Sequence, residues 1–368
     1  MNVNKLIVAT GERSSDLRYA THFPTPDDYI YIETPTRRSA ILSALEIGRA
    51  KSEVAAGVEL ICTEDFAGHT PEKIIIELAD RLNVHEFGVP ADFPLGLADA
   101  LRRAGLTLNP AVGTLFPQRE FKSAAEVAEL RRAARVADGG MRVAIGMIEA
   151  AEVALDSALM LEGEPLTSER IRTAIAVEFL RNGAMAESII VAGGVQGAQP
   201  HACGTGQLYA HTPIVMDLFP RLIDSGYWGD LTRTVTKGAA PDMVKRAFDA
   251  VLAAREAAKS KIRPGAIPAE IHLAAEESLA AAGFSTGIDG DGPYGFFHGL
   301  GHGLGLDIHE APRLNRHNAV GFSGGEAVTV EPGVYYPQWG GMRLEDAVVV
   351  TADGIDCLTG IETVLELI

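Results

Sequence analysis

Three histidines stand close together in one glycine-rich segment of the chain, residues 298–309. His298, His302 and His309 alternate there with glycines, which let the backbone lie against a ligand where a side chain would block it. Imidazole is a common metal ligand, and near neutral pH it also serves as an acid or a hydrogen-bond donor. Because three of the ten histidines share this segment, it indicates a site rather than an ordinary loop between strands.

Four carboxylates occur in two similar sequence units on either side of this segment. Asp217 ends an apolar run and Asp230 precedes the next one, and Glu331 and Glu345 repeat the arrangement downstream. The residues between the two acids of each unit suit hairpins or short returns, so we expect two hairpin-like units that carry their acids to one site. Four acids flanked by apolar runs are costly to bury unless they are paired or bound to cations.

Two Asp, one His and two Glu form a ligand set for a pair of divalent metal ions. Oxygen-rich ligation with one imidazole favours Mn²⁺, Co²⁺ or Zn²⁺ over a thiolate zinc site. Five residues follow, in this order, the metal ligands of a known family: Asp217, Asp230, His302, Glu331 and Glu345. The sequence thus resembles the pita-bread metallopeptidases, which include methionine aminopeptidase, aminopeptidase P and prolidase. The recognisable similarity spans roughly residues 123–368.

The resemblance implies a role for each ligand. Asp217 would bind one ion alone, Asp230 and Glu345 would bridge the two ions, and His302 and Glu331 would complete the second. We expect Mn²⁺ first, with Co²⁺ or Zn²⁺ as alternatives.

The remaining site residues bring the resemblance closer to the proline-specific branch of the family. His201 aligns with the histidine on the substrate side, and His309 with the one that stabilises charge on the scissile group. His298 aligns with the extra substrate-binding histidine of the proline-specific enzymes. Arg343 stands two residues before Glu345, and neighbours two apart in a strand share a face, so it should orient that carboxylate. We therefore expect His201, His309 and Arg343 to be catalytic.

The spacing of the first two acids departs from the family pattern. Asp217 and Asp230 are thirteen positions apart, about two more than the family has, and Leu218 to Arg221 occupy the start of the turn. Two extra residues should lengthen the hairpin tip and leave both strand faces in phase, because side chains alternate with a period of two.

The function implied is hydrolysis of the peptide bond before proline by a hydroxide that bridges the two ions. The substrates would be Xaa-Pro dipeptides or peptides with an N-terminal Xaa-Pro. Proline suits a dedicated site because its nitrogen carries no N–H and its ring fixes φ. A creatinase-like hydrolase of a small non-peptide amide stays open, as does another metal-dependent hydrolase or lyase on this fold, since a metal site alone does not define the substrate.

Composition excludes several other classes of protein. The formal charge of −17 argues against nucleic acid and anionic membranes as partners. No apolar run approaches the ~20 residues of a membrane span, and no signal peptide is apparent. Cys62, Cys203 and Cys357 lack metal-ligand spacing and indicate free thiols in a reducing compartment, so we expect a cytoplasmic protein.

The order of expected elements predicts an α+β protein of two domains. A smaller α/β creatinase-like domain, 1–120, would precede a pita-bread catalytic domain, 121–368. Strands are expected at 5–9, 29–32, 187–193, 213–235 and 326–366. Helices are expected at 40–50, 97–104, 123–150, 167–182, 242–260 and 268–282. In the resembling family the first domain packs against a neighbouring subunit, so we expect a homodimer.

Overall fold

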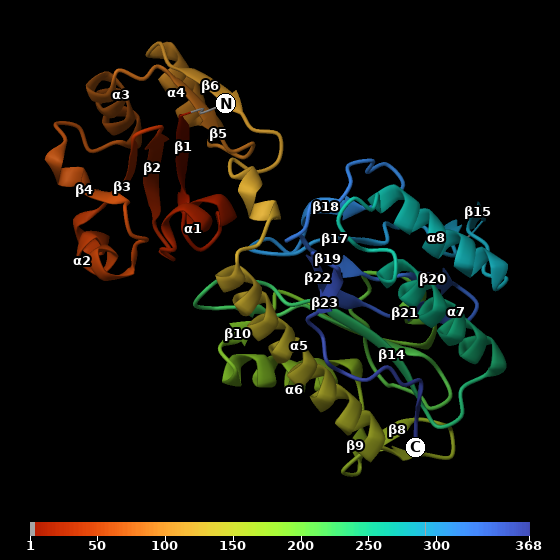
Figure 1. Ribbon diagram of the computed structural model, residues 1–368. Helices are drawn as coiled ribbons and strands as arrows, with labels where there is room; N and C mark the ends of the chain where they lie inside the picture. The colour runs from red at the N-terminus through yellow and green to blue at the C-terminus, as the bar shows by residue number, and fades with distance from the viewer. Residues whose placement is uncertain (1–3, 291) are drawn as a thin grey trace. The chain divides into compact units, whose positions relative to one another are not determined.

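The computed structural model describes residues 4–290 and 292–368 and mixes helices with sheets throughout, as an α+β protein should (Figure 1). The chain forms two compact units, one extending to Arg119 and the other running from Glu120 to Ile368. The division into two domains that fold independently, 1–120 and 121–368, stays a prediction. Among the described residues, no helix combines the length and the apolar character that a membrane crossing requires.

The first unit is built on one mixed sheet with the strand order β4-β3-β2-β1-β5-β6. Strand β1 pairs antiparallel with β2 and parallel with β5. Its strands are β1 (Lys5–Thr10), β2 (Asp28–Thr34), β3 (Arg37–Leu42), β4 (Glu59–Cys62), β5 (Glu86–Val89) and β6 (Thr107–Pro110). Its helices are α1 (Ser15–Thr21), α2 (Ala44–Glu53), α3 (Pro71–Leu82) and α4 (Leu95–Arg103).

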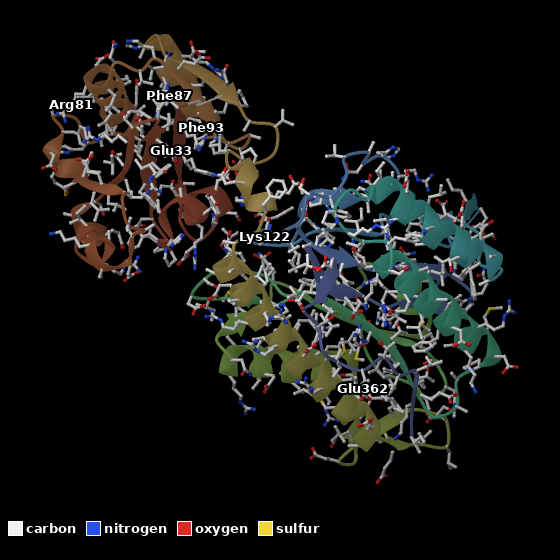
Figure 2. All side chains as sticks on the ribbon, in the orientation of Figure 1. Glu33, Arg81, Phe87, Phe93, Lys122 and Glu362 are labelled. Carbon is white, nitrogen blue, oxygen red and sulfur yellow. The ribbon has the colours of Figure 1, made fainter. Side chains whose placement is uncertain are left out.

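Both faces of this sheet are buried, because successive side chains of a strand point to opposite faces. Leu6 and Val8 of β1 pack into one apolar core, together with Phe87, which Figure 2 labels. Ile7, between them, packs into a second core with Tyr31. The sheet is therefore covered on both sides.

The helix predicted at 40–50 is wrong in its first part. Residues 40–42 belong to strand β3, where Ala40 pairs with Tyr31 of β2 and with Leu60 of β4. Helix α2 begins only at Ala44. Apolar residues at the start of the segment fit either structure, and pairing with two neighbouring strands decides for the strand.

The second unit contains four long helices at the predicted positions. They are α5 (Ala124–Ala150), α6 (Ser168–Arg181), α7 (Asp242–Lys259) and α8 (Pro268–Ala281). Ser123 caps α5, because its hydroxyl accepts from the Glu126 N–H while the Glu126 carboxylate accepts from the Ser123 N–H. Thr167 caps α6 with a single bond, in which its hydroxyl accepts from the Arg170 N–H.

Two sheets of the second unit hold the strands that carry the predicted acids. One has the order β11-β12-β14-β24 and the other the order β18-β17-β19-β22-β23. The first contains β11 (Ile189–Gly193), β12 (Ile214–Leu218), β14 (Leu231–Lys237) and β24 (Glu366–Leu367). The second contains β17 (Gly301–Gly303), β18 (Glu310–Leu314), β19 (Ala327–Val330), β22 (Asp346–Thr351) and β23 (Gly354–Cys357). A hairpin of β20 (Gly333–Tyr336) and β21 (Gly340–Arg343) lies between β19 and β22 in sequence.

Shorter strands complete the second unit. The pair β10 (Ala184–Met185) and β13 (Arg221–Leu222) holds part of the lengthened turn. The others are β7 (Glu152–Val153), β8 (Leu159–Leu161), β9 (Glu164–Pro165), β15 (Gly287–Asp289) and β16 (Gly292–Tyr294).

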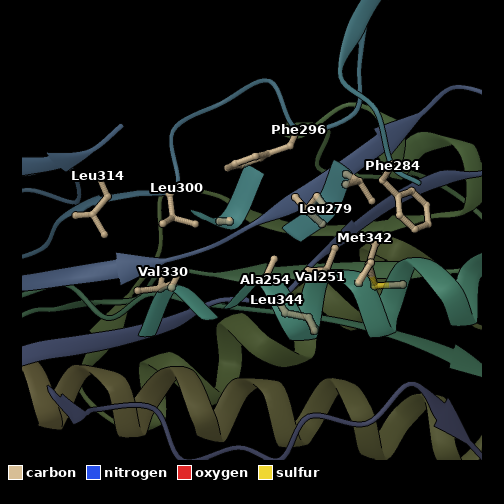
Figure 3. Packing of buried hydrophobic residues seen from close by; sticks show 14 of the residues in the cluster. Val251, Ala254, Leu279, Phe284, Phe296, Leu300, Leu314, Val330, Met342 and Leu344 are labelled. Atoms are coloured by element: carbon tan, nitrogen blue, oxygen red, sulfur yellow. The ribbon is translucent and has the colours of Figure 1, made fainter. Parts of the chain in front are cut away.

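An apolar core joins helices α7 and α8 to the strands beside the predicted site. Val251 of α7 and Leu279 of α8 pack in one cluster with Val330, which ends β19 (Figure 3). Leu344, next to Glu345, belongs to the same cluster. Tight packing behind Glu331 and Glu345 therefore fixes the backbone from which these acids project.

Candidate metal centre and catalytic cavity

All nine residues singled out in the sequence line one cavity of about 970 Å³ in the second unit. They are His201, Asp217, Asp230, His298, His302, His309, Glu331, Arg343 and Glu345. Apolar side chains form other parts of its wall, among them Ile190, Phe219, Phe297 and Ile308. The cavity lies within the size range of small-molecule sites.

The two hairpin-like units are confirmed by strand pairing. Strands β12 and β14 are antiparallel with Asp217 opposite Thr232, and β19 and β22 are antiparallel with Val330 opposite Asp346. Each unit thus has one acid at the end of its first strand and one acid just before its second. The extra residues of the first unit leave the strands in phase, since Asp217 and Asp230 both reach the cavity.

Three side chains form the tightest group in the cavity. One ligand atom each from Asp230, His302 and Glu345 lie within 4.8 Å of one another, and all three residues are buried. His302 Nε2 is 3.6 Å from an oxygen of Asp230 and 3.4 Å from an oxygen of Glu331. The structure therefore brings three of the four predicted carboxylate ligands together around the His302 imidazole.

Burial governs the pKa values in this group. It raises the pKa of Asp230 and of Glu345 well above the ordinary range, and neighbouring carboxylates add to the shift. Burial likewise raises the pKa of Glu331 to about 8. It lowers the pKa of His302 to about 3, with help from His309. Packed negative charge is thus unfavourable here without a cation, whereas the imidazole is neutral at pH 7.

The donor atoms fit divalent metal ions. The His302 Nδ1 lies 3.1 Å from the Gly303 carbonyl oxygen, which can only accept, so the proton sits on Nδ1. The Nε2 lone pair then faces carboxyl oxygens of Asp230 and Glu331, which become further acceptors once these acids are ionised. Asp217 Oδ1 is also buried, and no described residue hydrogen-bonds it. Neutral imidazole held by a second hydrogen bond, together with several carboxylates, is the chemistry of a metal site.

Arg343 holds Asp217, and the expectation that it orients Glu345 is wrong. Its Nη2 donates to an Asp217 oxygen at 2.6 Å, with both side chains largely buried. Strand β21 ends at Arg343, so Glu345 is not on the same strand and the two-residue rule does not apply. Thr232 orients Glu345 instead, since its hydroxyl donates to the Glu345 carboxylate at 2.7 Å.

A hydrogen-bonded chain links Arg343 to His298. The Arg343 Nη1 donates to the Tyr335 hydroxyl at 2.7 Å, and that hydroxyl lies 3.1 Å from His298 Nε2. His298 Nδ1 is 2.7 Å from the Gly299 carbonyl and must donate to it, so Nε2 accepts from Tyr335. Burial and the nearby Arg343 charge lower the pKa of His298 to about 4. Both nitrogens of the neutral ring are therefore engaged within the protein.

His201 and His309 are more exposed than the other site histidines. The His309 ring stands at 88° to that of His302, with the centroids 4.3 Å apart. Partial burial and the charge of Arg313 lower the pKa of His309. His309 is thus a neutral hydrogen-bonding group beside the acid cluster.

Arg313 and Tyr335 are two of the cavity residues that the sequence analysis did not identify. Arg313 follows His309 by four positions, but His309 precedes β18 and the pairing of β17 with β18 is irregular, so strand alternation could not have revealed it. Tyr335 lies in the apolar strand β20, four residues after Glu331, and nothing in its sequence surroundings distinguishes it from a core tyrosine.

Solved structures define the class of protein to which this fold and cavity belong. The structure is similar to that of a Xaa-Pro dipeptidase from Bacillus anthracis, with a TM-score of 0.84 and 25% identity over 99% of this chain and 95% of that chain. The fold is therefore the pita-bread fold, and the class is that of the metal-dependent peptidases.

The chain belongs to metallopeptidase family M24, whose sequence profile matches residues 128–352. It is 30% identical over 330 residues to a Xaa-Pro dipeptidase of Pyrococcus horikoshii, covering 84% of this chain and 88% of the relative. It is also 30% identical over 289 residues to the uncharacterized peptidase YqhT of Bacillus subtilis, covering 77% of this chain and 73% of the relative. The resemblance stated from the sequence is confirmed.

Proposed function

We propose that the protein hydrolyses the peptide bond before proline in Xaa-Pro dipeptides, using two divalent metal ions. The observation that carries this proposal is the cluster of buried carboxylates around the His302 Nε2 lone pair, in one cavity with His309 and Arg313. The names of the Pyrococcus horikoshii and Bacillus anthracis relatives support the same substrate class.

Five residues would hold the ions, with Asp217 on the first, His302 and Glu331 on the second, and Asp230 and Glu345 between them. Two bound divalent ions would supply Lewis acidity toward a carbonyl oxygen and lower the pKa of a shared water. We propose Mn²⁺ as the natural ion, with Co²⁺ or Zn²⁺ as alternatives. A cytoplasmic homodimer also stays a proposal.

The protein's own groups prepare the site for this chemistry. Arg343 orients Asp217 through a hydrogen bond, and Thr232 orients one oxygen of Glu345 in the same way. His309 would donate a hydrogen bond to the carbonyl oxygen as negative charge develops there, and His201 would close the other side of the substrate. His298 would shape the proline pocket with its ring, because both of its nitrogens are already bonded.

Arg313 favours a dipeptide over a longer substrate. Its guanidinium lines the cavity and influences His302, His309 and Glu331 electrostatically, so it lies close to the reacting groups. In an Xaa-Pro dipeptide the proline carboxylate follows the scissile bond directly, and a guanidinium is suited to bind it in a bidentate manner. We therefore assign Arg313 as the anchor of this carboxylate.

A comparison of substrates tests the proposed function. The purified protein is stripped with a chelator, reloaded with Mn²⁺ and assayed on Ala-Pro, Ala-Pro-amide, Ala-Ala and Met-Ala-Ser. We expect fast hydrolysis of Ala-Pro and little release of methionine from Met-Ala-Ser. Comparable rates on these two peptides would refute the proline assignment. A protein with bound metal that cleaves none of the peptides would favour the small-amide hydrolase instead.

A further inference from the structure

The loop of residues 304–309 connects the two most important histidines of the cavity. It begins after β17, which contains His302, and ends at His309, immediately before β18. Strands β17 and β18 pair antiparallel, with Gly303 opposite Glu310. The position of His309 over the acid cluster therefore depends on how this short loop is held.

The carboxylate of Glu310 points back toward the 304–309 loop and forms a hydrogen bond with its backbone. One oxygen accepts from the Asp307 N–H at 3.0 Å, and the other receives the Lys122 ammonium at 3.0 Å. A Cβ on Gly305 would lie 2.5 Å from this carboxylate, so a side chain at this position would displace the Glu310 carboxylate from the loop. The side chains of Lys122 and Glu310 are 1% and 7% exposed, which makes this a buried ion pair.

Lys122 is itself fixed to the sheet that carries the second pair of acids. Its N–H donates to the Gly325 carbonyl at 2.8 Å, and the neighbouring Phe121 forms a β-bridge with Glu326. Residue 326 directly precedes β19 and accepts from the Val350 N–H of β22. Figure 2 labels Lys122 just before the first turn of α5. The ammonium thus reaches the loop from a rigid part of the unit.

The lengthened turn between Asp217 and Asp230 holds the loop from another side. The Trp228 N–H donates to the Gly305 carbonyl at 3.0 Å, and its indole N–H donates to the Leu306 carbonyl at 3.0 Å. These two bonds engage residues 305–306, whereas the Glu310 carboxylate engages residue 307. The carboxylate that engages residue 307 belongs to the residue next to His309 in the chain.

We propose that Lys122 and Glu310 are positioning residues that set the location of the His309 imidazole beside the metal-binding cluster. A buried ion pair is poor evidence for added stability, because desolvation offsets the attraction of the two charges. The Lys122–Glu310 pair instead holds the 304–309 loop in one conformation. That loop ends at His309, whose imidazole would contact the substrate. The inference rests on the proposed role of His309 in catalysis.

Removal of the pair should lower turnover without removing metal. In Lys122→Met and in the double variant Lys122→Met/Glu310→Met, we expect kcat on Ala-Pro to fall about 10- to 100-fold, the effect of a displacement near 1 Å. KM should change little, because the lost interaction acts in the transition state. Metal content should equal that of the parent. Lys122→Arg, which retains the cation, should restore most of the turnover.

The double variant separates positioning from folding. Lys122→Met alone leaves a buried carboxylate without its partner and should lower the melting temperature, whereas the double variant removes both charges and should recover much of it. Turnover should stay low in both. Arg131→Met is the matched control, because it breaks an exposed ion pair to Asp356 on the same unit and should change neither kcat nor metal content.

A double-mutant cycle with His309 decides whether the pair acts through this residue. In a His309→Ala background, loss of the ion pair should have no further effect on kcat, because there is no imidazole left to position. Gly305→Ala provides an independent steric test, since its methyl group would displace the Glu310 carboxylate while both charges remain. It should reproduce the loss of turnover.

Three results would overturn the inference. They are parental kcat in the double variant, loss of metal together with turnover, and multiplicative effects of the ion-pair and His309 substitutions. None of these depends on the proposed function alone. An inactive parent would instead refute the function, and an active parent with an unimpaired His309→Ala variant would refute the assigned role of His309.

Discussion

His309 and Arg313 line the same cavity, and we propose a different role for each. His309 lies against His302 with ring centroids 4.3 Å apart, so its imidazole stands beside a proposed metal ligand. Arg313 lies in β18, four positions further along, and lines the same cavity as His309. In the proposed function, His309 would act on the scissile bond and Arg313 would hold the end of the substrate beyond it.

Replacement of Arg313 by Gln should impair binding of dipeptides selectively. A hydrogen bond to a charged group contributes about 1.5–3 kcal/mol, so we expect kcat/KM on Ala-Pro to fall roughly 10- to 150-fold. Ala-Pro-amide has no terminal carboxylate, and its kcat/KM should be almost unchanged. Parallel kinetics on the two substrates measure the difference. An equal loss on both would show that Arg313 does not recognise the carboxylate.

The limits of sequence reasoning at this scale are visible in Arg343. Its place near the site could be predicted, because it stands in the last acid-bearing segment and its type suits a carboxylate partner. Its actual partner, Asp217, lies 126 positions earlier in the chain. Only the approach of β12 to β21 selects this carboxylate, and a rule for neighbours within one strand could not reveal it.

At the scale of elements, strand β14 organises the segment that carries Glu345. Thr232 binds the Glu345 carboxylate, and Arg233 donates to the Glu345 carbonyl at 2.5 Å and to Asp346 at 2.9 Å. Asp346 also receives Lys259 of α7 at 2.8 Å and lies 3.5 Å from Arg255. One buried carboxylate thus joins a strand, a helix and the segment next to a proposed metal ligand.

Asp346→Asn should destabilise the protein at neutral pH. Burial alone would raise the pKa of Asp346, but Arg233, Arg255 and Lys259 together hold it well below the ordinary value. The substitution leaves buried cations uncompensated, at a cost of about 3–5 kcal/mol. Urea denaturation checks this value, with Asp356→Asn as the control, because Asp356 belongs to an exposed pair of little energetic weight. Equal stability of the two variants would contradict the assignment.

Helices of the second unit could be predicted closely, and those of the first unit less well. The sequence bounds of α5 to α8 agree with the structure to within one residue, since Ser123 and Thr167 are effective caps and Pro268 suits a first turn. Helix α3 was not predicted, and residues 40–42 were assigned to a helix although they pair in the sheet. In a sheet buried on both faces, apolar residues lose the alternation that would identify a strand.

At the scale of the whole molecule, the acid cluster couples stability to metal and to pH. The pKa of Glu331 is raised to about 8 by burial, and burial also raises those of Asp230 and Glu345. Without metal, the folded protein therefore holds protons on these groups that the unfolded chain has already released near pH 4–5. Stability falls with rising pH wherever the native state binds more protons. Burial lowers the pKa of His298 to about 4 and that of His302 to about 3, and these neutral rings oppose the decline until the histidines of the unfolded chain lose their protons at about pH 6.5. The decline should therefore be clearest between about pH 7 and about pH 8.

The chelator-treated protein should thus be less stable at pH 8 than at pH 6, and bound metal should abolish this trend. Each carboxylic acid that titrates in the window contributes about 1.4 kcal/mol per pH unit. Divalent ions bind the ionised folded form, so they should raise the melting temperature most at the higher pH. Asp346 has a lowered pKa and does not titrate in this window, so it cannot produce the effect.

Thermal unfolding at both pH values, with and without Mn²⁺, measures the melting temperature under the four conditions. Asp230→Asn should bind less metal and show a shallower pH dependence when stripped. A stripped protein that gains stability between pH 6 and pH 8 would contradict the protonated state of the cluster.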